Sequence, residues 1–440
     1  MTILIKKKIN TFNKSILVDG DKSISIRWAL LASQALGKSR AYNLLRSEDV
    51  INTIKCLRTL GINIISKKTY HEINGCGLNN FNYKKNLKLN AGNSGTLGRL
   101  ILGLLIHSPY KIKLIGDKSL SKRDFHRVIK PLKKFGAKFY PKSKKKLPLL
   151  ISGSKFLKPI KYLENKGSAQ CKSTIMLAAL NTDGKTIIKA KKSRDHTEIL
   201  FRHLKLPIKI KKTKNFDLIE IEGGKKFKGF NYKIPSDISS SAFFIVLTIL
   251  SNNSNLTIKN VNINPSRTGV INILKKMNAK IKIKNKKKYK GEMIADISVK
   301  STKNLKAINC PSNLNTSAID EFLIIFLAAS RAKGISYFKN LSELNQKESP
   351  RLKLGSKILN MIGVKTKLTH HSIKIYGRPN LNLTGSYIIK DYLKDHRIFM
   401  MTTIAALTLG GKWKIHNSES IKTSFPSFLK IIKKLGGKIN

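Results

Sequence analysis

Residues 89–100 join a run of small residues to the start of an apolar helix, a combination typical of anion binding. Gly92 and Gly95 let the backbone approach a ligand, and Ser94 or Thr96 can serve as the N-cap. The first N–H groups of such a helix lack partners within the helix, so they can point at a bound anion. Because a plain capped loop is the commoner interpretation of so short a motif, it needs support from elsewhere in the chain.

Other expected helix starts carry groups of the same kind. Ser23 and Arg27 lie four residues apart on one helical face, with Lys22 just ahead of them and Gly37 where a C′ residue would end the helix. Taken alone, a capped helix with a solvated Lys/Arg pair explains this segment equally well. Hydroxyl, amide or arginine groups open three further helices, at residues 168–173, 193–198 and 234–241.

Acidic residues mark two helix starts in the second half of the chain. Asp320 and Glu321 precede an apolar helix, and Glu348 lies between Lys347 and Arg351 ahead of the next helix. Since the chain has 24 acidic residues against 86 basic ones, an acid among cations at a helix start is a candidate general acid or base. For Glu321 we prefer a simpler role, as a complement to the helix dipole.

Asp395, His396 and Arg397 open the last apolar helix, where a cap or a core imidazole is the alternative for His396. No spacing of His or acidic residues predicts a metal site, and we expect neither a metal nor a cofactor. The cysteines form no C-x-x-C pair, which fits a reducing compartment and predicts the cytoplasm; they are Cys56, Cys76, Cys171 and Cys310.

The formal net charge of +62 invites a nucleic-acid-binding interpretation. Lysines dominate the excess, with 14 of the 86 basic residues being arginine, and they are scattered along the chain without a basic stripe of interleaved aromatics. A solvated, lysine-rich surface that attracts small anions is therefore preferred. We expect no membrane partner, since the longest apolar helix core, 242–250, is far shorter than the ~20 residues of a membrane span.

A unit of apolar helix, turn and alternating strand recurs along the 440 residues, at 29–45, 100–116, 174–190, 242–261, 322–341 and 400–417. Amphipathic helices lie between these units, at 49–64, 126–140, 196–210, 267–283, 351–368 and 423–439. The glycine-rich residues 223–229 separate the third unit from the fourth. This pattern predicts an α/β protein of two three-unit globules, with its chemistry at helix starts that face a cleft.

These segments together resemble the EPSP synthase (3-phosphoshikimate 1-carboxyvinyltransferase) family over about residues 18–428. The carrying motifs are 21–27, 92–96, 122–123, 168–170, 193–197, 264–269, 347–348, Arg351 and 395–397. The Ser-Ala-Gln and Ser-Arg-Asp-His-Thr forms are similar to the second class of the family. The chain departs from the family pattern at Asp124, Asn345 and Pro350. Thr423 occupies a position where many members have a lysine, and Lys422 lies one residue away.

The resemblance implies a two-domain inverted α/β barrel of six βαβαββ-type repeats, three per domain, with the active site in the interdomain cleft. The residues before Asp21 then pack with the later half. We therefore expect one domain at 21–235 and a discontinuous second domain at 1–20 and 236–440, in a monomer.

The implied activity moves the enolpyruvyl group of phosphoenolpyruvate to the 5-hydroxyl of shikimate 3-phosphate and releases phosphate, in the shikimate pathway to chorismate and aromatic amino acids. By the resemblance, shikimate 3-phosphate contacts Lys22, Ser23, Arg27, Ser168, Ala169, Gln170, Arg194, Asp320 and Lys347. Phosphoenolpyruvate, or the herbicide glyphosate in its place, contacts Lys22, Gly95, Arg123, Gln170, Arg351 and Arg397. The catalytic residues are Asp320 as base, Glu348 as acid and Lys22, with His396 in support.

Two alternatives stay open. A sister enzyme of the same fold transfers enolpyruvyl to UDP-N-acetylglucosamine, but it usually carries a cysteine in the loop that matches residues 116–123, where this chain has none. A basic nucleic-acid-binding protein is the remote second alternative, and it would bind with a steep salt dependence.

Overall fold

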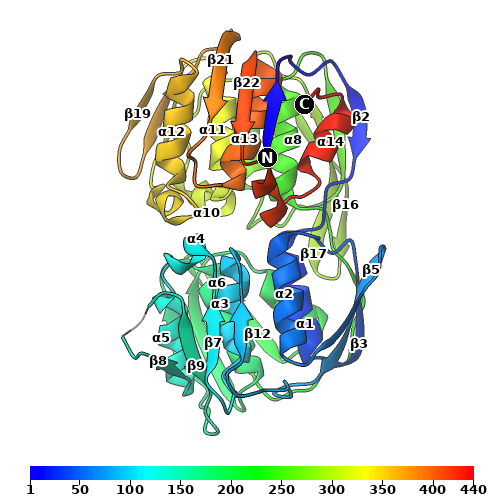
Figure 1. The fold of residues 1–440 in the computed structure, drawn as a ribbon, viewed down its shortest axis with the longest axis vertical. Coiled ribbons are helices and arrows are strands. Elements are labelled where there is room, and N and C mark those ends of the chain that lie inside the picture. The colour runs from blue at the N-terminus through cyan, green and yellow to red at the C-terminus, as the bar shows by residue number, and fades with distance from the viewer. Residues whose placement is uncertain (144) are drawn as a thin grey trace. The chain divides into compact units, whose positions relative to one another are not determined.

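The computed structural model describes residues 1–143 and 145–440. Within them the chain forms two compact units (Figure 1). Unit 1 comprises Met1–Asp19, Pro235–Tyr289 and Met293–Asn440, and unit 2 comprises Gly20–Ile234 and Lys290–Glu292. Each unit is therefore assembled from separate stretches of the chain.

In its described residues, unit 2 contains three four-stranded sheets, in the orders β14-β3-β5-β4, β6-β7-β9-β8 and β10-β11-β13-β12. The first pair of each sheet is parallel and the other pairs are antiparallel. The strands are β3 Leu36–Tyr42, β4 Asn63–Ser66, β5 Tyr70–Cys76, β6 Lys88–Asn90, β7 Ile112–Ile115, β8 Lys138–Tyr140, β9 Leu149–Ser152, β10 Lys161–Glu164, β11 Lys185–Lys191, β12 Ile208–Lys212, β13 Phe216–Glu222 and β14 Tyr232–Lys233.

Unit 1 likewise forms three sheets from the residues described, in the orders β16-β17-β15-β2, β18-β20-β19 and β1-β22-β21. The pairs β2–β15 and β21–β22 are parallel, and β1 runs antiparallel to β22. The strands are β1 Thr2–Ile5, β2 Asn13–Ile16, β15 Asn255–Asn262, β16 Ile281–Tyr289, β17 Glu292–Lys300, β18 Ile335–Phe338, β19 Thr366–Leu368, β20 Ile373–Tyr376, β21 Leu383–Ile389 and β22 Gly410–His416.

Two alternating series of helices connect these strands, and they confirm the six-fold repeat expected from the sequence. The buried apolar series is α1 Lys22–Gln34, α3 Gly95–Leu104, α6 Ala169–Leu180, α8 Ile238–Leu250, α11 Phe322–Ser330 and α13 His396–Leu409. The amphipathic series is α2 Glu48–Thr59, α5 His126–Phe135, α7 His196–His203, α9 Gly269–Lys276, α12 Arg351–Met361 and α14 Phe428–Leu435. Short turns complete the chain: α4 Lys118–Ser121, α10 Asn315–Ala318, η1 Ser312–Leu314, η2 Ser342–Gln346 and η3 Ser418–Thr423.

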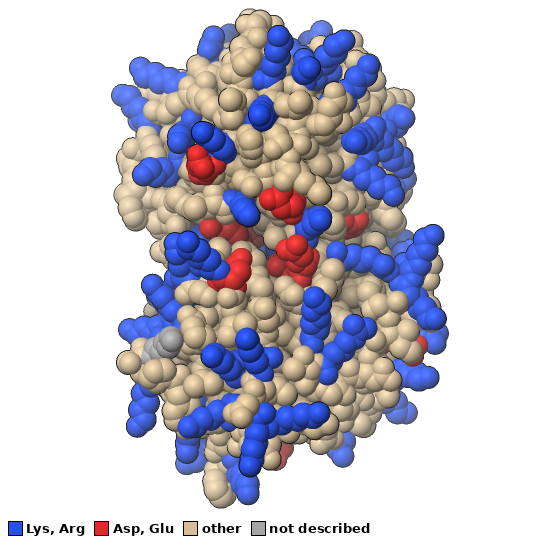
Figure 2. Space-filling model, in the orientation of Figure 1, with Lys and Arg blue, Asp and Glu red and all other residues tan. Residues whose placement is uncertain are grey.

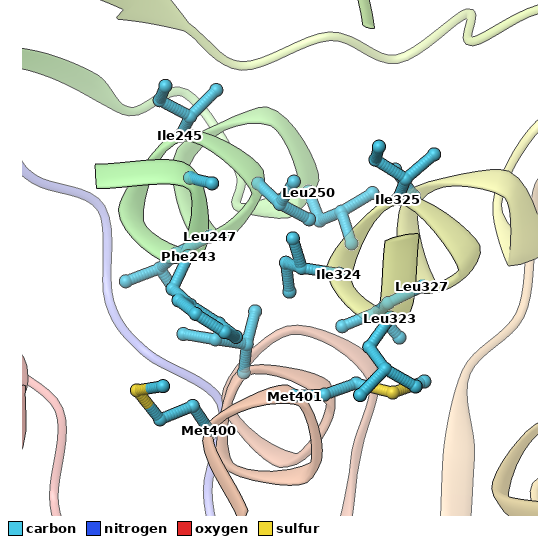
Figure 3. Packing of buried hydrophobic residues seen from close by; sticks show 14 of the residues in the cluster. Phe243, Ile245, Leu247, Leu250, Leu323, Ile324, Ile325, Leu327, Met400 and Met401 are labelled. Carbon is cyan, nitrogen blue, oxygen red and sulfur yellow. The ribbon is translucent and has the colours of Figure 1, made fainter. Parts of the chain in front are cut away.

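The apolar helices form the cores. In unit 1, α8, α11 and α13 pack together through side chains such as Phe243, Ile324 and Met401 (Figure 3). Every residue of α11 is buried, as expected for a helix that is hydrophobic on all sides. In unit 2, α3 packs on α6, and a Cβ at Gly103 would lie 2.4 Å from the carbonyl oxygen of Thr174. Only glycine allows this close approach.

Where the chain crosses near residues 20 and 235, the strand before each crossing pairs within the unit that the chain is leaving. β2 precedes α1 in sequence but pairs with β15 of unit 1, whereas β14 precedes α8 but pairs with β3 of unit 2. The predicted C′ role of Gly37 is wrong, because α1 ends at Gln34 and Gly37 lies within β3, opposite Gly75, with φ +85°. The backbone conformation of Gly37 is therefore set by the pairing of β3 with β5. Among the described residues no helix has the length and apolarity to span a membrane.

Candidate active site

Two cations of unit 2, Lys22 and Arg27, lie on α1. Asp21 caps the helix, accepting a hydrogen bond at 2.9 Å from the N–H of Ile24. Lys22 Nζ lies 2.9 Å from Oδ2 of Asp49 on α2 and keeps 23% of its side chain exposed. Ser23 is also partly exposed. An ammonium and a hydroxyl are thus available to a ligand at this helix start.

Arg27 is buried and lies among hydroxyl groups. Its Nε donates to Oγ1 of Thr197 at 2.8 Å, its Nη2 to Oγ of Ser173 at 2.9 Å, and its Nη1 to the carbonyl oxygen of Ser23 at 3.0 Å. The two hydroxyl oxygens lie 2.7 Å apart. These hydrogen bonds orient the guanidinium.

A second arginine fixes the amide at the start of α6. Ser94 caps α3, accepting from the N–H of Leu97 at 3.2 Å. Gln170 accepts a hydrogen bond from Nη1 of Arg99 at 2.5 Å and donates to Oγ1 of Thr96 at 3.1 Å. Sequence analysis missed Arg99, although its position four residues after Gly95 places it on the same face of α3.

Gly95 lies against two guanidinium groups. A Cβ at this position would lie 3.0 Å from Nη1 of Arg123 and 3.3 Å from Nη1 of Arg99. Arg123 also donates through Nη2 to Oδ1 of Asn93 at 3.3 Å. The absence of a side chain at Gly95 therefore decides how much room remains beside these two cations.

The remaining predicted residues of unit 2 lie at the starts of α6 and α7. Ser168 caps α6 by accepting from the N–H of Cys171 at 3.2 Å, and Ala169 is the first residue of that helix. Arg194 is partly buried, two residues ahead of His196 at the start of α7. The ring Nδ1 of His196 lies 2.6 Å from Oε1 of Glu292, and both side chains are buried.

In unit 1, Arg351 gathers carboxylates from separate segments. Its Nε donates to Oδ2 of Asp395 at 2.9 Å, its Nη2 to Oε2 of Glu348 at 2.5 Å, and its Nη1 lies 3.8 Å from Oδ1 of Asp320. Lys347 Nζ lies 3.4 Å from the same Asp320 oxygen. The predicted base and the predicted acid therefore share one buried cation.

Burial and charge oppose each other within this group. Burial alone would lower the pKa of Arg351, but the charges of Asp395 and Glu348 outweigh it and raise that pKa. Burial would raise the pKa of Asp395, but the charges of Arg351 and then His396 outweigh it and lower that pKa. Arg351 and Asp395 are thus each stabilised in the charged form.

Arg397 belongs to a neighbouring network at the starts of α8, α11 and α13. Its Nη1 lies 3.9 Å from Oε1 of Glu321, which also accepts a hydrogen bond from Oγ of Ser239. Arg267 donates to the Ser239 oxygen at 2.7 Å. Glu321 lies at the N-cap of α11, but its side chain makes no capping hydrogen bond, so its role extends beyond complementing the helix dipole.

The predicted supporting histidine is buried at the start of α13. Asp395 caps this helix, accepting from the N–H of Arg397 at 2.9 Å. Nδ1 of His396 lies 3.2 Å from Oγ1 of Thr423, while Lys422 is exposed. The departure from the family pattern at Thr423 thus gives His396 a hydroxyl neighbour.

Two other departures also have a structural role. Asp124 precedes Phe125, the N-cap of α5, and its Oδ1 accepts from the N–H of His126 at 2.7 Å. Pro350 is the N-cap of α12, where its carbonyl accepts from the N–H of Leu354 at 2.9 Å and no N–H of its own is needed. Both changes preserve the helix starts that carry the neighbouring arginines.

The two clusters bring cations, hydroxyl groups and carboxylates together at helix starts. In the part of the chain that is described, no group of three or more His, Cys, Asp and Glu residues could hold a metal ion. The family model described as EPSP synthase (3-phosphoshikimate 1-carboxyvinyltransferase) matches residues 6–432. The chain belongs to the EPSP synthase family.

Relatives support this membership along the whole chain. The 3-phosphoshikimate 1-carboxyvinyltransferase of Ruthia magnifica subsp. Calyptogena magnifica is 38% identical over 446 residues, covering 100% of this chain and 99% of the relative. The protein of the same name from Thermoanaerobacter sp. (strain X514) is 39% identical over 434 residues, covering 98% of this chain and 99% of the relative.

Solved structures agree with these relatives. EPSP synthase from Acinetobacter baumannii matches with a TM-score of 0.88 and 35% identity, covering 100% of this chain and 99% of that chain. The enolpyruvyl transferase NikO from Streptomyces tendae matches with a TM-score of 0.78 at 14% identity, covering 100% and 98%, and shows a shared fold. The expected two-domain enolpyruvyl transferase fold is thereby confirmed.

Proposed function

We propose a residue-by-residue mechanism for the chain, which acts as a 3-phosphoshikimate 1-carboxyvinyltransferase. It transfers the enolpyruvyl group of phosphoenolpyruvate to the 5-hydroxyl of shikimate 3-phosphate and releases phosphate, as family membership and the names of the relatives show. The roles assigned below to single residues are our proposals.

Unit 2 supplies most of the contacts to shikimate 3-phosphate. Ser23, Arg27, Ser168 and Gln170 lie at helix starts, where N–H groups and neutral hydroxyls surround the cations. Arg194, in the loop ahead of α7, adds a further guanidinium. These groups suit an acceptor that carries both a phosphate and a carboxylate, since guanidinium groups form charge-assisted hydrogen bonds with both kinds of anion.

Phosphoenolpyruvate contacts Lys22, Gly95 and Arg123 of unit 2, and Arg351 and Arg397 of unit 1. Gly95 leaves the room beside Arg123 that a carboxylate or phosphate oxygen needs. In Arg351, Nε and Nη2 already donate to carboxylates, so the ligand approaches through Nη1 and competes with Asp320 for it.

Proton transfer falls to Asp320 and Glu348, assisted by Lys22 and Lys347. Asp320 takes the proton of the 5-hydroxyl as that oxygen attacks C2 of phosphoenolpyruvate, and Glu348 gives a proton to the C3 methylene. The tetrahedral adduct then loses phosphate, which takes up the proton from Asp320, while a methyl proton returns to Glu348. A negative ligand beside Arg351 favours the proton that Glu348 must carry at the start.

Most of the proposed acceptor-binding residues belong to unit 2, and the proposed acid and base belong to unit 1. The observation that carries the mechanism is the sharing of Arg351 by Asp320 and Glu348, which brings two carboxylates and a cation together among anion-binding helix starts.

The test is phosphate release measured with purified protein. We expect release from phosphoenolpyruvate to require shikimate 3-phosphate and to continue in EDTA. Turnover with UDP-N-acetylglucosamine instead, or loss of activity in EDTA, would contradict the proposal. The names of the relatives specify the shikimate substrate, so they do not favour the UDP-N-acetylglucosamine alternative.

Nucleic-acid binding gains no support from the surface. On the face shown in Figure 2, Lys and Arg side chains are scattered over each unit rather than gathered in one stripe. Monomeric state and cytoplasmic location remain predictions from the sequence.

A further inference from the structure

A buried ion pair lies beside the acceptor-binding residues of unit 2. Nζ of Lys172 on α6 is 2.5 Å from Oε1 of Glu198 on α7, and their side chains are 0% and 4% exposed. Taking two charges out of water costs free energy that their mutual attraction often fails to recover. Stability alone is therefore a poor explanation for this pair.

The two charged residues are the sequence neighbours of the hydroxyls that hold Arg27. Lys172 precedes Ser173, and Glu198 follows Thr197. The hydroxyls of Ser173 and Thr197 lie 2.7 Å apart, and each accepts a hydrogen bond from the Arg27 guanidinium. The ion pair thus joins α6 to α7 at the level where both helices contact Arg27.

Few other groups restrain these charges. Among the described residues, Oε2 of Glu198 has no hydrogen-bond partner, and Nζ of Lys172 makes none beyond its contact with Glu198. Lys172 has no exposed surface, so it cannot touch a substrate. Any effect of Lys172 on the reaction has to pass through the residues that it holds in place.

Lys172 also acts on a second substrate-binding segment. Oε2 of Glu164 accepts a hydrogen bond from the N–H of Ser168 at 3.0 Å, ahead of α6. Burial raises the pKa of Glu164, while the N–H of Ser168 and, more weakly, the charge of Lys172 oppose that rise. Lys172 therefore favours the ionised carboxylate that holds the Ser168 backbone.

We infer that the Lys172–Glu198 pair is a positioning device that sets the affinity for shikimate 3-phosphate by fixing the Ser173 and Thr197 hydroxyls around Arg27. The inference rests on the proposed function, in which Arg27 and Ser168 contact this acceptor. It assigns the pair to the acceptor and not to phosphoenolpyruvate, because Arg27 and Ser168, the residues positioned through these contacts, belong to the proposed acceptor set and not to the phosphoenolpyruvate set.

The first experiment is a double-mutant cycle of Glu198→Gln and Thr197→Val, with calorimetric binding of shikimate 3-phosphate and steady-state KM for both substrates. We expect each single variant to weaken acceptor binding about tenfold, and the double variant to be no weaker than the singles, because both remove the same restraint. KM for phosphoenolpyruvate should change less than about threefold. Unchanged acceptor affinity in Glu198→Gln, or losses that multiply to about a hundredfold, would overturn the inference.

The second experiment separates positioning from stability. Lys172→Met combined with Glu198→Met replaces the pair by apolar side chains of similar length, which is often neutral or stabilising. We expect an unfolding temperature near that of the wild type and acceptor affinity still about tenfold reduced. Wild-type values of both the unfolding temperature and the acceptor affinity would show that the pair has only a structural role. If the double Met variant does not fold, the cycle above still decides.

A control uses another ion pair of unit 2, in which Nε of Arg40 lies 2.6 Å from Oε2 of Glu72, on paired strands β3 and β5. Arg40→Met should leave acceptor affinity unchanged, and a tenfold loss there would make the result at Glu198 non-specific and overturn the inference. Wild-type phosphate release with shikimate 3-phosphate is measured alongside. Its absence would refute the proposed function, whereas normal release with unaltered affinity in the pair variants refutes the inference alone.

Discussion

The arginines of the two clusters donate to different kinds of side chain. In unit 2, Arg27 donates to hydroxyls and Arg99 donates to the amide oxygen of Gln170. In unit 1, Arg351 donates to carboxylates and Arg397 lies near the carboxylate of Glu321. Neutral partners orient a cation, whereas carboxylates also balance its charge and can themselves carry protons.

The difference lies in side chains rather than in the scaffold. Both clusters occupy the starts of apolar helices in the same repeated arrangement of helices and sheets. The pair Lys22–Asp49 is an exception in unit 2, since a carboxylate there contacts a lysine that keeps partial exposure. One repeated scaffold can therefore present an anion-binding surface in one unit and a proton-transfer group in the other.

The largest expected effect comes from removing a proton carrier in unit 1. Asp320→Asn and Glu348→Gln should each lower kcat by about 10² to 10⁴, the usual contribution of a general acid or base. The measurement is phosphate release at saturating concentrations of both substrates.

A nearby carboxylate provides the control for that experiment. Glu343 lies 3.7 Å from Lys347, with 55% of its side chain exposed, and an exposed pair contributes little. Glu343→Gln should keep near-normal kcat. Near-normal kcat in Asp320→Asn or Glu348→Gln would instead show that the role assigned to that residue is wrong.

The free energy of unfolding should depend on the balance of charge between Arg351 and its carboxylate partners in unit 1. Asp395→Asn leaves Arg351 short of a carboxylate and should lower the free energy of unfolding by about 3–5 kcal/mol at neutral pH. Because the pKa of Asp395 is lowered in the folded protein, its contribution is present above the unfolded value of about 3.9 and is lost as the pH falls through the folded value. Denaturant unfolding of both proteins at several pH values should show their difference shrinking below about pH 4. A difference that stays constant into acid would contradict this account.

The smallest effect concerns the space beside the unit 2 cations. Gly95→Ala places a methyl group close to Arg123 and Arg99, which should cost a ligand filling that space about 1–3 kcal/mol. We expect the inhibition constant of glyphosate to rise far more than KM for phosphoenolpyruvate. Measuring both constants decides the matter, and a wild type indifferent to millimolar glyphosate would show that other residues set the shape of this site.

Gly98→Ala is the matched control on the same helix. A Cβ there would meet apolar atoms of Phe125, Ala91 and Leu120 at 3.4–3.5 Å, which is ordinary contact. Both constants should stay near their wild-type values. A shift as large as that at Gly95 would mean that α3 as a whole had moved.

Local patterns in the sequence were sufficient for the helices and their starts. The six apolar helices follow from their composition, and Asp21, Ser94 and Ser168 are caps because their side chains satisfy N–H groups within three residues. Such contacts depend on neighbours along the chain, which the sequence displays. Gly37 shows the limit, since its conformation is set by a strand 38 positions away in the pairing with Gly75.

The side-chain partners within each cluster could not be predicted in the same way. Sequence analysis placed Asp320, Glu348 and Arg351 at helix starts, but their common contact depends on how α11 and α12 pack. Arg99 and Lys172 were missed because nothing in their own segments marks their partners, Gln170 and Glu198. Contacts between distant segments are a property of tertiary packing and leave no local signal.

Because β1 pairs with β22, the first strand of the growing chain cannot join its sheet until residues near 416 have been synthesised. Thr2 lies opposite His416, 414 residues later, and Leu4 donates from its N–H to the carbonyl oxygen of Asn440. At ~5–20 residues per second, a ribosome makes the partner strand about 20–80 s after β1. Apart from Lys290–Glu292, unit 2 is already synthesised at Ile234. Until β22 has been synthesised, β1 is an unpaired edge strand, and its apolar side chains Ile3 and Ile5 cannot be buried as they are in the folded protein.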